Sequence, residues 1–172
     1  VDIPATAGAY QLEAALVKPG ADLVRSLRDF SVMTDEERQA RFGIAVGKSV
    51  KASSSLHRDG ATSPEAVVDG NPGTRWSSEF SDPQWIAVDL GRPEKVGRIV
   101  LDWEGAFGKA YAIEVSADGE AWKEVHRTDA GRGGSEEIRL VAPVEARWVR
   151  MRGTQRATQY GYSLFEMRVY RP

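Results

Sequence analysis

The sequence contains no cysteine among its 172 residues. This absence excludes a disulfide framework, a thiolate nucleophile and a zinc site with sulfur ligands. Long apolar runs are missing as well, since no stretch approaches the 18 apolar residues of a transmembrane helix. An excess of one charge is also absent, because 23 Lys and Arg residues oppose 25 Asp and Glu residues. The net charge of −2 provides no electrostatic footprint for nucleic acid or an anionic membrane.

The first residues, VDIPATAG, have neither an initiator Met nor the apolar segment of a signal peptide. We therefore interpret the sequence as a piece of a longer protein. Its length allows one well-cored domain of about 120 to 150 residues and a small additional segment.

Residues 1–33 show the alternation of a β-hairpin. Apolar side chains recur at every second position from Tyr10 to Leu16, the turn sequence KPG follows, and residues 24–32 suggest a second strand. The segment YQLEAALV is also compatible with a short helix. Because an isolated hairpin is only marginally stable in water, we expect residues 1–33 to be the C-terminal strands of an upstream β-domain.

Residues 34–45 are predicted to form a helical linker. Thr34 is a candidate N-cap, Glu37 follows three residues later as its capping-box partner, and Gly43 can end the helix. The charged residues of MTDEERQARFG indicate a solvated face.

From residue 46 onward the pattern changes to eight short strand-like runs. Turn signals such as GRPEK and SADGEA separate them, and no long helical pattern intervenes. The sequence therefore predicts an all-β, antiparallel sandwich or jelly roll. The runs are SVKASS, QWIAVDL, KVGRIVLDW, AYAIEVSA, AWKEVHR, EEIRLV, RWVRMRG and SLFEMRVY.

The turn VVDGNPGTRWSS concentrates oxygen-bearing side chains in a few residues. Asp69, Asn71 and Thr74 can aim several oxygens at one point, and calcium takes six to eight oxygen ligands. Glu166 lies among apolar neighbours in SLFEMRVY, where a buried unpaired carboxylate would be costly. The alternative is an ordinary Asx turn, with Glu166 paired to Arg168 or another cation on the surface.

Several of these motifs together carry a family resemblance. AVVDGNPGTRWSS, DPQWIAVDLG, YAIEVSADGEAW, RWVRMRG and GYSLFEMRVY resemble, in the family's order, the discoidin or coagulation factor type C domain. The resemblance is strongest to the family 32 carbohydrate-binding modules and covers about residues 46–171. It implies an eight-stranded jelly-roll sandwich of the galactose-binding-like type over residues 46–172, with a ligand site on loops at one edge. It also suggests that residues 1–33 end an immunoglobulin-like domain of a multidomain glycoside hydrolase.

The resemblance implies a structural calcium ion near one end of the sandwich. By position, Asp69 and Glu166 would supply carboxylates and Thr74 its hydroxyl or carbonyl. Backbone carbonyls would come from Ala66, Asn71 and Phe165. This calcium would pin loops to the sandwich and would have no catalytic role.

The ligand site is expected on three loops that expose aromatic and polar residues, namely SSEFSDPQ, WEGAFGKA and TQRATQYGYS. Sugar recognition needs an aromatic face for the ring and polar groups for the hydroxyls. The candidate ligand-binding residues are Glu79, Phe80, Trp103, Glu104, Phe107, Arg156, Tyr160 and Tyr162. By contrast, Trp76, Trp85, Trp122 and Trp148 are interpreted as core or partly buried fillers.

The candidate set departs from that of the galactose-binding branch of the family. The resemblance implies that a galactose-binding member would have a His, an Arg and an Asn in its ligand site. Only His57 lies in an early loop, His126 falls in a predicted strand, and Asn71 is the single asparagine. The loops look more like those of modules attached to enzymes acting on β-glucans and chitosan. In chitosan-binding members, acidic residues and a tyrosine would correspond to Glu79, Glu104 and either Tyr160 or Tyr162.

We therefore expect a non-catalytic carbohydrate-binding module, with chitosan or glucosamine oligomers as first choice and β-glucan as second. Its other partner would be an upstream catalytic domain, and the family suggests an extracellular, secreted protein. No catalytic residue is predicted, because the loop carboxylates lie in open polar segments and no G-x-S-x-G elbow surrounds Ser53–Ser55. The alternatives are a structural domain packing on the parent enzyme and a lipid or protein adhesion domain.

Overall fold

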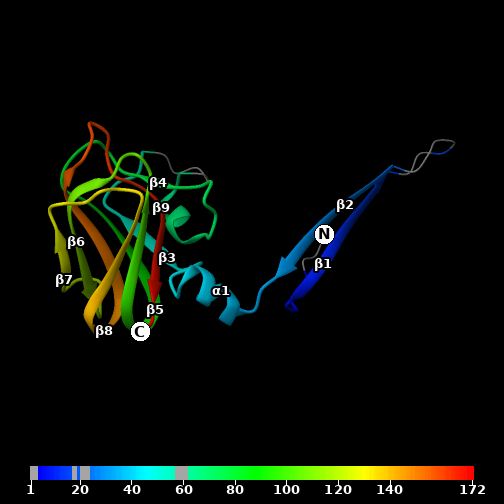
Figure 1. The fold of residues 1–172 in the computed structure, drawn as a ribbon, viewed down its shortest axis with the longest axis horizontal. Helices are drawn as coiled ribbons and strands as arrows, with labels where there is room; N and C mark the ends of the chain where they lie inside the picture. The colour runs from blue at the N-terminus through cyan, green and yellow to red at the C-terminus, as the bar shows by residue number, and fades with distance from the viewer. Residues whose placement is uncertain (1–3, 17–18, 20–23, 57–61) are drawn as a thin grey trace. The chain divides into compact units, whose positions relative to one another are not determined.

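The computed structural model describes residues 4–16, 19, 24–56 and 62–172 (Figure 1). It divides into two units, Val1–Ala40 and Arg41–Pro172. The predicted turn at residues 18–20 falls largely outside the described residues, and His57 lies outside them entirely. No described helix is long and apolar enough to cross a membrane.

The first unit contains an antiparallel hairpin. Strand β1 (Gly8–Leu16) pairs with β2 (Val24–Val32) over nine residues each, so the alternative of a short helix in YQLEAALV is wrong. One face carries the stacked rings of Tyr10 and Phe30, whose centroids are 5.5 Å apart. The opposite face is polar and includes the hydrogen bond from Gln11 to Asp29. The hairpin is therefore amphipathic.

Helix α1 (Asp35–Phe42) begins with the predicted capping box. The Glu37 backbone N–H donates to Thr34 Oγ1 at 3.0 Å, and the Thr34 N–H donates to Glu37 Oε2 at 2.8 Å. No residue of the helix is buried, as its charge pattern indicates. The helix ends at Phe42, just before Gly43, whose φ of 81° favours glycine. A Cβ there would also lie 2.5 Å from the Val169 carbonyl oxygen.

The second unit is an all-β, antiparallel jelly-roll sandwich, as predicted. Its strands run in the order β4-β9-β5-β8-β6-β7, and β3 pairs with β5. A short 3-10 helix, Pro64–Val68, precedes β4. The strands are β3 (Ser49–Ala52), β4 (Trp76–Ser77), β5 (Gln84–Trp103), β6 (Gly108–Ser116), β7 (Lys123–Thr128), β8 (Ser135–Arg156) and β9 (Ser163–Tyr170).

Two long strands, β5 and β8, each contain two of the predicted runs. The sequences between those runs, GRPEK and VAPVEA, lie inside the strands, and the β5–β8 register shifts between Asp89 and Glu94. The first half of β5 pairs with β3, whereas its second half pairs with β9. The second half of β8 pairs with β6. β5 and β8 therefore bend between their two halves, and each strand contributes to both layers of the sandwich.

The core lies between the two layers and collects the inward side chains of the strands. In β5, Ile86, Val88, Ile99 and Leu101 are fully buried. Trp76 and Trp148 are buried as well, while Trp85 and Trp122 are half-buried on either side of Arg150. The four tryptophans therefore occupy the core and partly buried positions predicted for them.

Candidate functional site

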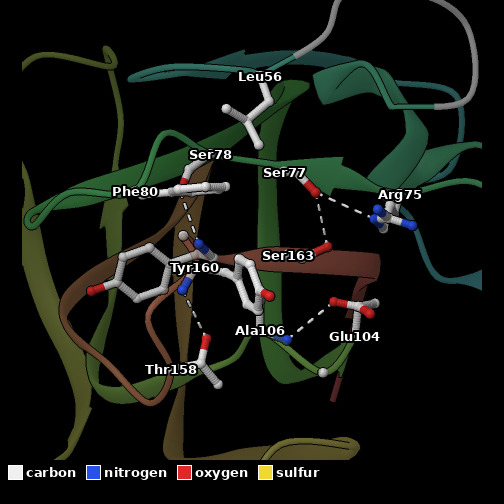
Figure 2. Close-up of a pocket in the computed structure, with 13 residues that line it drawn as sticks. Leu56, Arg75, Ser77, Ser78, Phe80, Glu104, Ala106, Thr158, Tyr160 and Ser163 are labelled. Atoms are coloured by element: carbon white, nitrogen blue, oxygen red, sulfur yellow. Dashed lines mark hydrogen bonds between the residues drawn. The ribbon is translucent and has the colours of Figure 1, made fainter.

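Three loops meet at one end of the sandwich and form a pocket of about 410 Å³ (Figure 2). They follow β4, join β5 to β6, and join β8 to β9, while Leu56, which follows β3, and Arg75, which precedes β4, complete the lining. The lining consists of Leu56, Arg75, Ser77, Ser78, Phe80, Glu104, Gly105, Ala106, Thr158, Tyr160, Gly161, Tyr162 and Ser163. These are the loops on which the sequence predicts a ligand site.

One side of the pocket is aromatic. Phe80 and Tyr160 remain 52% and 53% exposed, and their rings meet edge to face with centroids 5.7 Å apart. Leu56, also exposed, lines the pocket beside them (Figure 2). Large apolar side chains are rarely left this exposed together unless something covers them, so this wall is suited to an apolar surface such as the C–H face of a sugar.

The other side of the pocket is polar and is connected by hydrogen bonds. Arg75 Nε donates to Ser77 Oγ at 3.3 Å, and the Ser77 and Ser163 hydroxyl oxygens are 3.1 Å apart. The Glu104 backbone N–H donates to the Ser163 carbonyl at 3.0 Å. The Glu104 carboxylate accepts the Ala106 N–H at 3.1 Å, which fixes its direction and leaves acceptor capacity for a ligand (Figure 2).

Asp82 links the loop that carries Phe80 to the loop that carries Tyr160, and these are the two aromatic loops of the pocket. The hydroxyl of the fully buried Tyr162 donates to one carboxylate oxygen of Asp82, and Arg156 Nε donates to the other at 3.1 Å. Arg156 Nη1 also donates to the Tyr160 carbonyl at 3.4 Å. Burial, reinforced by Asp82, raises the pKa of Tyr162 far above its ordinary value, so its hydroxyl stays a donor.

The structure brings Phe80, Glu104 and Tyr160 together in the pocket, with Tyr162 buried beneath it. Glu79 is exposed but is not among the lining residues. Arg156 also stands outside the lining, where it braces the Tyr160 loop. Phe80, Glu104 and Tyr160 are therefore candidates for direct contact with a ligand, whereas Arg156 is a candidate for holding the Tyr160 loop in place.

Two predicted ligand residues are corrected by the structure. Trp103 is only 4% exposed and packs in the core, where its Nε1–H donates to Glu136 at 3.0 Å. Phe107 packs against the core and lies beside Gly133. Trp103 is thus buried and Phe107 is partly buried, and neither side chain lines the pocket.

Sequence reasoning missed several lining residues, among them Leu56, Arg75, Ser77, Thr158 and Ser163. Arg75 and Ser77 belong to the same TRWSS motif that supplies the candidate metal turn, and this proximity was the available signal. His126, which the sequence placed in a strand and not in a ligand loop, lies in β7, with the centroid of its ring 6.4 Å from that of Tyr111.

In the candidate metal turn, the oxygens of Asp69 and Asn71 accept hydrogen bonds from residues of the same turn. Asp69 accepts the Asn71 N–H at 2.7 Å and the Thr74 hydroxyl at 2.7 Å. The Thr74 hydroxyl also lies 2.8 Å from the Asn71 carbonyl. Ala66 lies in the preceding 3-10 helix. These contacts are those of an Asx turn, and alone they do not require a cation.

Glu166 provides the second observation at this turn. It is 8% exposed, and its Oε1 has no hydrogen-bond partner. Burial first and the neighbouring Asp69 second raise its pKa to about 7, so the two carboxyl groups are close. The alternative pairing with Arg168 is not formed, because that guanidinium binds Asp102. Phe165 precedes Glu166 in β9. The charge of Arg168 and a hydrogen bond from the Gly70 backbone lower the pKa of Glu166 and only partly offset its burial. The oxygen that lacks a hydrogen-bond partner fits a cation at this point.

The described part of the chain contains no group of three or more His, Cys, Asp or Glu side chains that could hold a metal. A metal at Asp69 and Glu166 would therefore need backbone and hydroxyl oxygens to complete its shell. Calcium accepts such mixed ligands readily.

Comparison with known proteins identifies relatives that share the fold of the second unit. Residues 49–167 match the F5/8 type C domain. Chitosan-binding module 1 of a chitosanase/glucanase from Paenibacillus sp. IK-5 is 40% identical, with a TM-score of 0.69 over 74% of this chain and 97% of that one. Module 2 of the same enzyme, solved in complex with chitotriose, is 39% identical, with a TM-score of 0.69 over 74% of this chain and 98% of that one.

A third relative is the polysaccharide lyase 8 family protein HylA of Enterococcus faecalis, 38% identical over 88 residues. The match covers 50% of this chain and 6% of the lyase, so the chain spans a small part of that protein. The fold is that of carbohydrate-binding modules, and the family match covers most of the second unit. The chain belongs to the F5/8 type C domain family.

Proposed function

We propose that the second unit is a non-catalytic module that binds a β-linked glycan in the pocket. Glucosamine oligomers such as those of chitosan are the first choice, and neutral β-glucan is the second. The observation that carries the proposal is a pocket in which an exposed aromatic pair, Phe80 and Tyr160, accompanies the carboxylate of Glu104. The similar module solved with chitotriose supports the choice of an amino sugar.

The chemistry of the pocket suits a glucosamine unit. Its ring can lie against Phe80 and Tyr160, while its ammonium group donates to Glu104. Because both the carboxylate and the aromatic rings are solvent-accessible, each contact contributes modestly and the charged one weakens with salt. The expected affinity is therefore modest and falls as ionic strength rises.

A hydrolytic role is not supported by the pocket. Glycosidases use a pair of carboxyl groups that flank the scissile bond. Among the described residues that line the pocket, Glu104 is the single acid, since Glu79 lies outside it and Asp82 is held by Tyr162 and Arg156. We therefore assign the pocket to binding, which would raise the local concentration of substrate for an attached enzyme.

Calorimetric titration of the full 172-residue chain tests this function. Chitotriose and longer glucosamine oligomers should bind, with about a three- to fivefold loss for Glu104→Gln and a larger loss for Tyr160→Ala. Glu79→Gln is the matched control, because it removes an exposed carboxylate just outside the pocket. Binding of a neutral β-1,3-glucan that ignores salt and Glu104→Gln would favour the second choice. Silence for all glycans would refute a glycan-binding function and favour a structural domain.

We further propose that Asp69 and Glu166 hold a structural calcium ion, with Thr74 and the carbonyls of Asn71, Ala66 and Phe165 completing the shell. The orphaned Glu166 oxygen beside Asp69 supports this assignment. Calcium would neutralise two adjacent carboxylates and fasten the turn to β9.

We also infer that the module belongs to a larger, extracellular polysaccharide-degrading enzyme. The partial match to a polysaccharide lyase family protein supports an enzyme parent, although our prediction from the sequence was a glycoside hydrolase. Residues 1–33 would close an upstream β-domain, residues 34–45 would form the linker, and residues 46–172 would be the module. The test is to look for the full-length protein in the culture medium of the organism that produces it. Its presence there would support the extracellular location, and its retention on polysaccharide would support the binding role of the module.

A further inference from the structure

The polar side of the pocket carries a guanidinium group as well as a carboxylate. Arg75 lies immediately before β4, is exposed, and lines the pocket. Its Nε donates to Ser77, whose hydroxyl is 3.1 Å from that of Ser163, and the Ser163 carbonyl accepts the Glu104 N–H. Figure 2 shows Arg75 and Glu104 on either side of Ser163. A cation and an anion therefore share one wall of the site.

Arg75 differs from neighbouring arginines in having no acidic partner among the described residues. Arg156, which braces the Tyr160 loop of the same pocket, is by contrast paired with Asp82 at 3.1 Å. The Arg75 guanidinium uses only Nε, in a long bond to a neutral hydroxyl. Its two terminal nitrogens, the fork that matches a carboxylate in bidentate fashion, remain available to a ligand.

This cation conflicts with a ligand made of glucosamine alone. Each unit of such a chain carries an ammonium group, and a guanidinium in the same pocket repels it. The conflict disappears if the unit beside the amino sugar carries an acidic group, because Glu104 and Arg75 then each face an opposite charge. A cation and an anion fixed in one site discriminate between ligands by charge pattern as well as by attraction.

We propose that the pocket recognises a glycan in which a hexosamine at Glu104 adjoins a uronate whose carboxylate binds Arg75. This inference rests on the proposed function, since Phe80, Tyr160 and Glu104 must first hold a sugar there. It adds an acidic subsite to that function and makes Arg75 a specificity-determining residue.

The test compares three tetrasaccharides by calorimetry on the full chain at low salt. One alternates glucuronate with glucosamine, the second is the same molecule with its carboxyl groups reduced to alcohols, and the third contains glucosamine only. The wild-type chain should bind the acidic form about five- to tenfold more tightly than the reduced form. Arg75→Gln should bring this ratio to about one and should bind the all-glucosamine form about twofold more tightly, because one like charge is removed.

Two further variants sharpen the result. Arg75→Lys keeps the positive charge but lacks the planar guanidinium. In this variant the difference in binding free energy between the acidic and the reduced form should fall to less than half of its wild-type value. Arg92→Gln is the charge-matched control, since Arg92 is 74% exposed and lies outside the pocket, and it should preserve the full preference. Because Arg75 is exposed, its variants should melt at the wild-type temperature.

The possible failures are distinguishable. If the wild-type chain binds the all-glucosamine form but does not distinguish the acidic form from the reduced one, the acidic subsite is refuted and the proposed function stands. If Arg92→Gln lowers the preference as much as Arg75→Gln, the effect is long-range charge and the assignment to Arg75 is wrong. If none of the three tetrasaccharides binds, the acidic subsite and the choice of an amino sugar are both wrong, and titration with the neutral β-1,3-glucan decides whether the pocket binds a glycan.

Discussion

Replacing Tyr162 with Phe removes one buried hydroxyl that helps to hold the two aromatic loops of the pocket together. The hydroxyl donates to Asp82, which also accepts Arg156, and Arg156 in turn holds the Tyr160 carbonyl. A hydrogen bond to a charged group contributes about 1.5–3 kcal/mol. Because the Asp82 side chain is 31% exposed, water replaces part of that contact. We expect Tyr162→Phe to lower the free energy of unfolding by about 1–2 kcal/mol.

The same substitution should also weaken glycan binding, by about three- to tenfold. With the Tyr162 tie lost, the Phe80 and Tyr160 rings must be ordered by the ligand, and ordering such groups costs about 0.5–1.5 kcal/mol for each side chain. The measurements are urea unfolding for stability and calorimetric titration with chitotriose for affinity. Both are made on the full chain.

Tyr111→Phe provides a matched control within the same core. Tyr111 is buried and its hydroxyl donates to Glu136 at 2.6 Å, but neither residue lines the pocket. Burial, followed by the carboxylate partner, raises the pKa of both phenols. Tyr111→Phe should therefore cost a similar amount of stability and leave affinity unchanged. Equal losses of affinity in the two variants, or none in Tyr162→Phe, would refute the view that Asp82 positions the pocket.

Three further predictions concern regions outside the pocket. Calcium should raise the melting temperature of the wild-type chain above its value in EDTA by a few degrees, and Glu166→Gln should remove most of this rise in scanning fluorimetry. The Glu120 N–H, the Ala121 N–H and the Ser116 hydroxyl lower the pKa of Asp118 to about 2. Since this folded-state pKa lies below the unfolded value, the resulting stabilisation is complete above about pH 4 and is lost as pH falls toward 2. Asp118→Asn should flatten that dependence in urea titrations from pH 2 to 5. Gly131→Ala should destabilise the fold by about 1–3 kcal/mol, because its Cβ would lie 2.1 Å from the Gly108 carbonyl oxygen, whereas Gly105→Ala meets nothing within 4 Å and serves as control.

The strands were predictable where a local pattern suffices. Alternation placed the runs of β5, β6, β8 and β9, and the capping box placed the start of α1 because Thr34 and Glu37 satisfy each other's backbone donors. The bends inside β5 and β8 were not predictable. Gly91, with φ of 85°, and Pro93 read as a turn, yet the chain continues in the same strand with a shifted register. A bend and a turn use the same residue types and differ only in their long-range pairing.

The sequence identified the loops that form the pocket but misjudged the burial of two aromatic residues in them. Phe80, Glu104 and Tyr160 stand in loops, where no strand pattern claims their side chains. Trp103 was misassigned because it ends β5, and the Glu136 carboxylate that accepts its N–H is 33 residues away in the sequence. Arg75 was missed for a related reason, since it reaches the pocket from a turn to which the sequence gives another role.

A physical rule connects these outcomes and can guide interpretation of related sequences. A buried Tyr or Trp must find an acceptor for its O–H or N–H, and in this sandwich a carboxylate fills that role for Tyr162 (Asp82) and for Trp103 (Glu136), whereas Trp76 donates to the Ser54 carbonyl. Acids used in this way cannot also receive a ligand's donors at full strength. Glu104 is different, because its carboxylate accepts one backbone N–H and no aromatic donor among the described residues. Glu104 therefore combines two properties that the other acids of these loops do not share, since it lines the pocket and is not engaged by a buried aromatic donor.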